Sequence, residues 1–227
     1  SNKISYSKQR RYLYGKELDS VTNYPLRESL INFVKGYIDS NKFIRRIMSL
    51  YENYPRENFY GNMNIIGTHD TERIFSILNR KINILKIIVV LQMTLPGVPL
   101  IYYGDEAGME GNKDPDNRRS YPWNNENKDI LSFYKEIIAI RNKEEALKNG
   151  TLKFYNTDSE VCAFERVYEE EKIVVIVNRS DCIKIIRGIN FNKKYRDLLG
   201  NNKEYIKLGI NNELVLEAYD MKILKSI

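Results

Sequence analysis

The residues Asn64-Ile65-Ile66-Gly67-Thr68-His69-Asp70-Thr71-Glu72-Arg73 decide the fold of this chain. They contain the only histidine of the 227 residues, and it stands directly beside a carboxylate. The pair Ile65–Ile66 is typical of the end of a buried strand, and residues 71–78 have the pattern of a short helix that Asp70 or Thr71 can cap. A strand that ends in a polar cluster and runs into a helix is the corner where α/β barrels hold their chemistry. Taken alone, such a pair is equally compatible with a structural histidine beside a helix cap.

The composition is that of a globular chain able to bury a core, with 42% hydrophobic and 29% charged residues. Lys and Arg number 36 against 30 Asp and Glu, but these charges are scattered and the densest basic pieces, residues 8–11 and 193–196, form no stripe. Nucleic-acid binding favours a coherent basic stripe or a recognisable module, so we predict no nucleic-acid partner. The most apolar run, residues 87–95, is too short to span a membrane and contains Gln92, so we predict no membrane partner.

The two cysteines, Cys162 and Cys182, lie in β-like segments without metal-binding spacing. A disulfide is compatible with them, but in a chain of this size the pattern favours buried free thiols. With one histidine and no cysteine cluster, we predict no metal site and no cofactor. The beginning Ser1-Asn2-Lys3, without an initiator Met or a signal region, is typical of a chain cut from a longer parent.

Up to about Lys143, apolar segments of strand length alternate with helical periodicity. Strands are expected over residues 17–23, 65–66 and 98–103, and the last of these, a continuous apolar run, is typical of a parallel strand buried on both faces. Helices are expected over residues 26–38, 41–51, 71–78, 82–95 and 129–141. This order predicts βαβ units and therefore an α/β fold.

After about Glu144 the pattern changes to short strands separated by Asn, Gly and Asp turns. They are expected over residues 151–156, 161–168, 172–178, 182–187, 204–208, 214–217 and 221–224. Such a series predicts an antiparallel β-sandwich of about 80 residues. We therefore divide the chain into residues 1–143 and a sandwich domain of residues 144–227.

Three further motifs accompany the opening stretch. They are Asp19-Ser-Val-Thr-Asn-Tyr-Pro25, Leu95-Pro-Gly-Val-Pro-Leu-Ile-Tyr-Tyr-Gly-Asp-Glu-Ala-Gly-Met-Glu-Gly111 and Asp114-Pro-Asp-Asn-Arg-Arg-Ser-Tyr-Pro-Trp123. In this order the four motifs resemble the α-amylase family of glycoside hydrolases, and most closely its neopullulanase and cyclomaltodextrinase branch. The resemblance implies that residues 1–143 are the C-terminal part of a (β/α)8 TIM barrel, strands 6–8, and that a β-sandwich follows.

The resemblance also implies roles for four residues. It makes Asp70 the third catalytic carboxylate, which favours the distorted, oxocarbenium-like sugar ring, and it makes His69 a donor to a sugar hydroxyl. Asp114 and Arg118 match the family's Asp-Pro-x-x-Arg motif, which binds the next glucose toward the non-reducing end. An ionised carboxylate accepts strong hydrogen bonds from vicinal hydroxyls, which is consistent with these roles. The alternative for Asp114 and Arg118 is a local surface ion pair.

Other residues near these motifs have less specific signals. Tyr103 is expected to wall the sugar pocket, and the two acidic residues Asp105 and Glu106 to cap and brace the loop that follows. Arg73 is equally compatible with a place near the sugar, where it would help bind substrate, and with the surface of a helix. Trp123, the only tryptophan, is expected to be a packing anchor rather than a sugar platform.

The chain departs from the family in its catalytic carboxylates. Retaining hydrolysis needs a nucleophile and a general acid about 5 Å apart, and the family motifs that supply them, Asp-Gly-x-Arg-x-Asp and Gly-Glu-x-Trp, do not occur in this sequence. We therefore expect a fragment of a retaining hydrolase that cleaves α-1,4 or also α-1,6 bonds of α-glucan oligosaccharides and is inactive alone. A non-catalytic carbohydrate-binding or assembly relative is the alternative. Open sheet edges near Val21 and Ile101 further predict a homo-oligomer formed through the exposed half-barrel.

Overall fold

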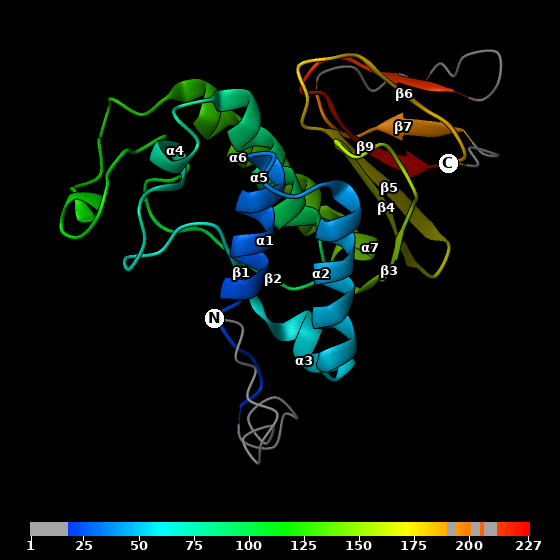
Figure 1. The fold of residues 1–227 in the computed structure, drawn as a ribbon, viewed down its shortest axis with the longest axis horizontal. Helices are drawn as coiled ribbons and strands as arrows, with labels where there is room; N and C mark the ends of the chain where they lie inside the picture. The colour runs from blue at the N-terminus through cyan, green and yellow to red at the C-terminus, as the bar shows by residue number, and fades with distance from the viewer. Residues whose placement is uncertain (1–17, 190–193, 201–204, 207–212) are drawn as a thin grey trace.

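The computed structural model describes residues 18–189, 194–200, 205–206 and 213–227. Within this part the chain begins with helices and ends with strands, and Figure 1 shows the helical half and the strand half side by side. Four of the predicted segments lie wholly or partly outside the described residues: the basic pieces 8–11 and 193–196 and the strands over 17–23 and 204–208.

A small parallel sheet lies at the base of the helical half. Strand β1 (Met63–Ile65) pairs in parallel with β2 (Val98–Leu100), and Thr22 adds an isolated parallel bridge to Met63. Strands are therefore present at two of the three places predicted in this half, each three residues long, whereas the described part of the segment over 17–23 contributes only the bridge of Thr22. Gln92, which interrupts the most apolar run of the sequence, donates from Nε2 to the carbonyls of Asn64 and Leu100 at 2.9 and 3.0 Å, so a buried amide joins the two strands.

The prediction that residues 98–103 form a strand buried on both faces is wrong. Strand β2 ends at Leu100, and the side chains of Val98 and Leu100 are 51% and 46% exposed. The physical reason is that Val98 and Leu100, two residues apart, point to the same face of the sheet, and the described residues leave that face uncovered.

The helices follow the predicted apolar periodicity closely. Their bounds are α1 Tyr24–Val34, α2 Ser40–Asn53, α3 Arg56–Gly61, α4 Ile74–Ile77, α5 Ile82–Thr94, the 3-10 turn η2 Asp116–Arg118, α6 Lys128–Lys143 and α7 Glu145–Asn149. Side chains of Asn23, Asp39 and Asn127 cap α1, α2 and α6 by accepting a backbone N–H. The short α3 and α7 were not predicted, because neither is long enough to show a period.

The helix after the His-Asp pair begins later than expected. Helix α4 starts at Ile74, and its N-terminal flanking residue is Arg73, without a side-chain cap. Thr71 instead accepts from the N–H of Thr68 at 3.1 Å within a turn, so the predicted cap by Asp70 or Thr71 is wrong. Asp70 is thereby left free of a structural role in the helix.

Helix α5 is the centre of the core. Its residues 87–91 have no exposed surface, and it packs against α1, α4, α6, α7 and β5. Two buried arginines bind the carbonyl groups at its C-terminal end: Arg141 of α6 donates to Met93 at 2.7 Å, and Arg166 of β4 donates to Thr94 at 2.6 Å. Burial lowers the pKa of these two guanidinium groups to about 10 and about 9. The end of α5 therefore joins the helical half to the strand half.

The strand half contains two antiparallel sheets. The larger has the order β3-β4-β5-β9-β7, and the smaller pairs β6 with β8. Their bounds are β3 Thr151–Phe154, β4 Val161–Tyr168, β5 Glu171–Asn178, β6 Lys184–Ile186, β7 Tyr195–Asp197, β8 Leu214–Leu216 and β9 Met221–Ser226. One face of the larger sheet joins the core around α5, and a second apolar cluster fills the space toward β6 and β8. Strand β7 was not predicted, and the division at residue 143 stays a prediction.

The two cysteines differ in environment. Both are free thiols, and Cys162 is buried in β4, where burial raises the pKa of its thiol above the usual range. Cys182 is exposed in the turn before β6, so the prediction of a buried thiol is confirmed for the first and wrong for the second.

Candidate functional site

The candidate site lies at the C-terminal ends of β1 and β2, where the chain leaves the parallel sheet. His69 and Asp70 follow β1, and the long segment after β2 extends beyond the helices, at the left in Figure 1. The imidazole Nε2 of His69 lies 3.2 Å from Oδ1 of Asp70, and both side chains are more than half exposed. This arrangement leaves both groups open to a ligand.

The segment after β2 brings a second pair to the same place. Nε of Arg118 lies 3.1 Å from Oδ1 of Asp114, and its Nη2 lies 3.9 Å from Oδ1 of Asp70. The same Nε also donates to the backbone carbonyl of His69 at 3.1 Å. The structure therefore places the four residues implied by the resemblance next to one another, with Arg118 between the two carboxylates.

Asn117 fixes the distance between the two segments. Its buried amide donates to the carbonyls of His69 and Thr71 at 2.7 and 2.8 Å. A bidentate link of this kind holds the His-Asp turn against the turn η2 that carries Arg118. Sequence reasoning missed Asn117, because it occupies a variable position of the Asp-Pro-x-x-Arg pattern and nothing in its neighbours marks it as buried.

Arg73 lies beneath the site rather than on a helix surface, so that alternative is wrong. Its side chain has no exposed surface with which to contact a sugar, which also corrects its predicted part in substrate binding. The guanidinium donates to the carbonyls of Asn117, at 2.8 Å, and Tyr103. It also lies over the rings of Tyr102 and Tyr103, with 4.2 and 4.7 Å from Cζ to the ring centroids. Arg73 thus joins the ends of both strands and the Asn117 segment.

Asp105 is the buried partner of Arg73. Its Oδ1 lies 3.1 Å from Nη1 of that arginine. Burial raises the pKa of Asp105 to about 7, although Arg73 acts in the opposite direction. A Cβ at Gly67 would lie 2.1 Å from Oδ2 of this carboxyl, so glycine is required at the end of β1. Glu106 accepts the N–H of Gly104 at 2.8 Å, and these two acidic residues brace the loop as expected.

The aromatic residues around the site are more exposed than expected. Tyr103 presents part of its ring to solvent and donates from its hydroxyl to the carbonyl of Arg119 at 2.8 Å. Trp123 is 75% exposed, and its ring centroid lies 4.6 Å from that of Tyr121. The prediction that Trp123 is a packing anchor is therefore wrong.

An open hollow of about 500 Å³ adjoins the carboxylate of Asp70. Its lining combines Asp70 and Asp114 with Glu72, Lys113 and Arg27. Arg27, which sequence reasoning did not select, donates from Nε to the carbonyl of Ile66 at 2.8 Å and so holds the end of β1 from the α1 side. Within the described residues, no group of three or more His, Cys, Asp or Glu side chains is arranged to hold a metal ion, and no helix has the length and apolarity to cross a membrane.

Comparisons of the sequence and of the structure with known proteins both match this chain to amylase-type enzymes. The catalytic-domain model of alpha-amylase matches residues 2–127. The chain is 36% identical over 222 residues to an amylopullulanase of Thermoanaerobacter thermohydrosulfuricus, covering 82% of this chain and 15% of that protein. It is 38% identical over 221 residues to a cyclomaltodextrinase of Thermoanaerobacter pseudethanolicus, covering 94% of this chain and 37% of that protein. The fold matches the crystal structure of a maltogenic amylase from S. marinus with a TM-score of 0.80 and 31% identity, over 96% of this chain and 30% of that one.

Proposed function

The chain belongs to the α-amylase family of glycoside hydrolases, and from this premise we propose that it is the C-terminal part of an enzyme that hydrolyses α-glucosidic bonds. It spans well under half the length of the curated relatives it matches, so the activity belongs to a longer polypeptide. In that polypeptide the segment around Thr22, β1 and β2 belong to strands 6, 7 and 8 of a (β/α)8 barrel. The sheets that begin at Thr151 form a β-sandwich. The parallel register of β1 and β2 and the antiparallel order of the later strands support this assignment.

One observation carries the proposal: two segments far apart in sequence bring His69, Asp70, Asp114 and Arg118 together. A sugar presents adjacent hydroxyl groups that both donate and accept hydrogen bonds. An exposed cluster of two carboxylates, a guanidinium and an imidazole offers both kinds of partner at one surface. The substrate class that fits is therefore an α-glucan oligosaccharide.

Each group has a distinct task in this proposal. The carboxylate of Asp70 accepts hydrogen bonds from two vicinal hydroxyls of the sugar whose bond is broken. These bonds strengthen as positive charge develops on the ring, so they lower the barrier rather than merely tighten binding. His69 donates to a hydroxyl of the same sugar. The pair Asp114 and Arg118 binds the neighbouring sugar toward the non-reducing end.

The residues beneath the site position these groups. Arg73 binds the carbonyl of Asn117, and Asn117 binds the carbonyl of His69. Because this path runs through buried groups, it fixes the distance between the Asp70 carboxylate and the Asp114–Arg118 pair. The nucleophile and the general acid come from a part of the parent outside this sequence, which contains neither of the two motifs that would supply them.

Binding of maltotriose to the 227-residue chain tests the proposal. Titration followed by the NMR signals of His69, the only histidine, is expected to show saturable shifts that Asp114→Ala weakens by about tenfold or more. The matched control is Asp129→Ala, because Asp129 is a similarly exposed carboxylate in an ion pair, 2.8 Å from Lys86. Equal loss of binding in both variants, or no shift of the His69 signals, contradicts the proposal.

A further inference from the structure

A second hollow lies where the helical half meets the strand half. Its volume is about 410 Å³, within the range of ligand sites in proteins. Its walls come from the end of α1, the turn between α4 and α5, the β5–β6 turn and the residues that precede β4 and β9. Ile77 of α4 lines both this cleft and the hollow beside Asp70, so the cleft adjoins the candidate site at α4.

The first wall is the closed C-terminal end of α1. Gly36, at φ 79°, donates its N–H to Phe33 at 3.0 Å, and the next N–H, that of Tyr37, returns to Asn32 at 2.9 Å. This pair of bonds is the Schellman motif, in which a left-handed residue ends the helix. Because the motif fixes the backbone of Tyr37, it fixes where this exposed ring leaves the helix end.

The second wall is the C-terminal end of α4, which is closed by the same motif. Helix α4 ends at Ile77, Asn79 follows at φ 52°, and the N–H groups of Asn79 and Arg80 return to carbonyls of that helix. The ammonium of Lys35 donates to the carbonyl of Ile77 at 3.2 Å, so it joins the two helix ends. Two closed helix C-termini therefore meet at this cleft.

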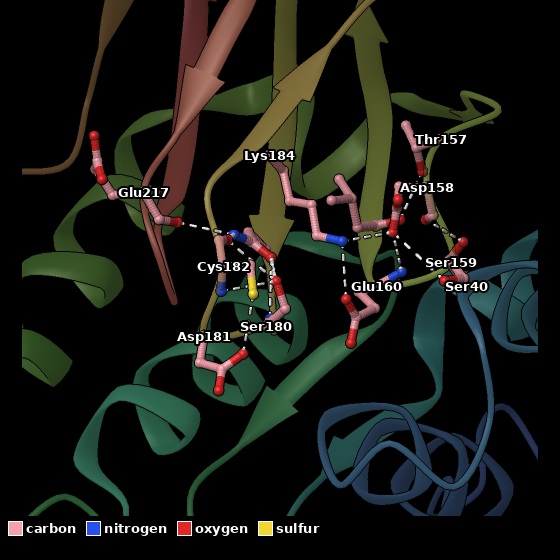
Figure 2. Close-up of polar contacts among 12 residues, drawn as sticks. Ser40, Thr157, Asp158, Ser159, Glu160, Ser180, Asp181, Cys182, Lys184 and Glu217 are labelled. Atoms are coloured by element: carbon pink, nitrogen blue, oxygen red, sulfur yellow. Dashed lines mark hydrogen bonds and ion pairs between the residues drawn. The ribbon is translucent and has the colours of Figure 1, made fainter.

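The third wall comes from the strand half and is drawn in Figure 2. There the carboxylate of Glu160 is held by Lys184, 2.9 Å away, and the hydroxyl of Ser180 donates to Asn178 at 2.7 Å. Asp181 follows Ser180 in the exposed turn, with its carboxylate next to the thiol of Cys182. These contacts hold two carboxylates in place on the side of the cleft opposite the helix ends.

Arg179 fastens the strand wall to the helix wall. Its guanidinium donates to the carbonyls of Phe33 and Ile38 and lies over the Phe33 ring, 4.6 Å from Cζ to the centroid. Since one side chain of the β5–β6 turn binds on both sides of the α1 end, the cleft is a fixed feature of the fold. Its shape is set by contacts within the protein and does not require a bound ligand.

The lining of the cleft carries charges of both signs, from Lys35, Lys81 and Arg179 and from Glu160 and Asp181. Lys35 and Arg179 are bound to backbone carbonyls, and Glu160 is bound to Lys184. Sugar hydroxyls both donate to carboxylates and accept from ammonium groups, so a neutral ligand rich in hydroxyl groups can use charges of both signs.

Two tyrosines supply flat apolar surfaces in the same cleft. Tyr37 is 67% exposed, with Nζ of Lys35 5.3 Å from its ring centroid. Tyr219 lines the same cleft from the turn before β9, at φ 57°, and its N–H donates to the carbonyl of Ser180 at 2.9 Å. The C–H face of a glucose ring packs on an aromatic ring while its edge hydroxyls form hydrogen bonds, so this lining suits a sugar.

We propose that this cleft is a second binding site for a short α-glucan. Tyr37 and Tyr219 contact sugar faces, and the carboxylates of Glu160 and Asp181 accept sugar hydroxyls. The choice of α-glucan as the ligand rests on the proposed function. The existence of the site rests on the geometry of the cleft. The cleft binds a second stretch of the same glucan molecule whose other end the Asp70 site binds.

The test is a titration of maltotriose into the chain with Asp114→Ala and Arg118→Ala combined, so that the first site is disabled. Calorimetry is expected to show remaining binding, and Tyr37→Ala in this background is expected to weaken it at least about fivefold. The matched control is Tyr205→Ala, because Tyr205 is 59% exposed and also lies beside a lysine, with Nζ of Lys194 5.5 Å from its ring centroid. Far-UV circular dichroism of each variant checks the fold.

The outcomes of the two sites are separable. Binding that survives in the double variant, falls with Tyr37→Ala and leaves the His69 signals unshifted supports the cleft even if the Asp70 site binds no sugar. Absence of binding in the double variant, or equal loss with Tyr205→Ala, overturns the cleft proposal and leaves the first site untouched. Displacement of maltotriose by inorganic phosphate also overturns it, because it would show that the cleft selects anions.

Discussion

Arg73 and Asp105 form an ion pair in which neither side chain has any exposed surface, with 3.1 Å between Nη1 and Oδ1. The pair lies beneath the candidate sugar site, where Arg73 also binds the carbonyls of Tyr103 and Asn117. A buried ion pair seldom adds net stability, because removing both charges from water costs about as much as their attraction returns. Its value here is positional, since the guanidinium reaches three segments that no single hydrophobic side chain could join.

Replacement of Arg73 by Met is expected to destabilise the chain by about 3–5 kcal/mol, because it leaves Asp105 as a buried carboxyl without its partner. The free energy of unfolding in urea measures this loss. The control is Arg80→Met, since Arg80 forms an exposed ion pair, 2.5 Å from Glu110, of a kind worth about 0–1 kcal/mol. Equal effects of the two substitutions would show that the buried pair has no special part in the fold.

Stability is expected to depend on pH through Asp105. Its pKa is about 7 in the folded chain against 3.8 for an ordinary Asp, so between these values the folded state holds a proton that the unfolded state has lost. The contribution is therefore complete below about pH 4 and declines as pH rises to about 7, by up to about 4 kcal/mol. Above that pH, Asp105 adds no further dependence.

Comparison with Asp105→Asn isolates this effect. The amide cannot titrate, so the unfolding free energy of the original chain minus that of the variant should fall as pH rises from about 4 to about 7. A difference that stays flat over this range and instead rises with pH below about 4 would mean that Arg73, rather than burial, dominates the pKa of Asp105.

The sequence was most informative where one local pattern sets the structure. The helical period of residues 82–95 corresponds to α5, Ile82–Thr94, and the predicted strand over 161–168 has the bounds of β4. The four polar positions of the candidate site could likewise be selected from the sequence, because the motifs that contain them are contiguous, while their sugar-binding roles stay a proposal. That their side chains meet follows from two such motifs standing at the ends of neighbouring parallel strands.

Positions decided by distant contacts were not readable in this way. An arginine at the start of a helical pattern suggests a solvated surface, but Arg73 is buried by groups 30 and 44 residues away in the chain. The apolar pattern of β2 suggests burial, yet burial depends on what packs against each face of the sheet, and the described residues leave the face with Val98 and Leu100 uncovered. Trp123 has a size that suggests packing, and only the course of its loop leaves it exposed.

The chain by itself is expected to release no glucose or maltose from maltotriose or cyclodextrin. Retaining hydrolysis needs two carboxyl groups about 5–5.5 Å apart on either side of the bond, and the motifs that supply them in this family are not in this sequence. Loss of such a catalytic unit removes most of a rate enhancement of about 10⁶-fold or more. Product release by the pure chain above a buffer control would show that another carboxyl serves as nucleophile.

In the longer parent, Asp70→Asn and Asp114→Ala are expected to act on different kinetic constants. In the proposed role, Asp70 strengthens its hydrogen bonds in the transition state, so its substitution should lower kcat by orders of magnitude with little change in unfolding free energy. In the proposed role, Asp114 binds a sugar remote from the broken bond, so its substitution should chiefly raise KM. Steady-state kinetics with maltotriose and a longer oligosaccharide separate the two effects, and the reverse pattern would exchange the assigned roles.

The last prediction concerns β2, whose outer edge and exposed Val98 and Leu100 lie at the border of the small parallel sheet. An open strand edge with apolar side chains favours pairing with another chain, so we expect the isolated chain to be a dimer or larger through this edge. Light scattering measures its mass, and Val98→Lys should shift it toward the monomer, because a charge on the edge opposes pairing. Val215→Lys is the matched control, since Val215 is also 51% exposed in an edge strand, but of the separate β6–β8 sheet. A monomer at every concentration would mean that this edge is covered within the chain, and equal dissociation by both lysines would place the contact elsewhere.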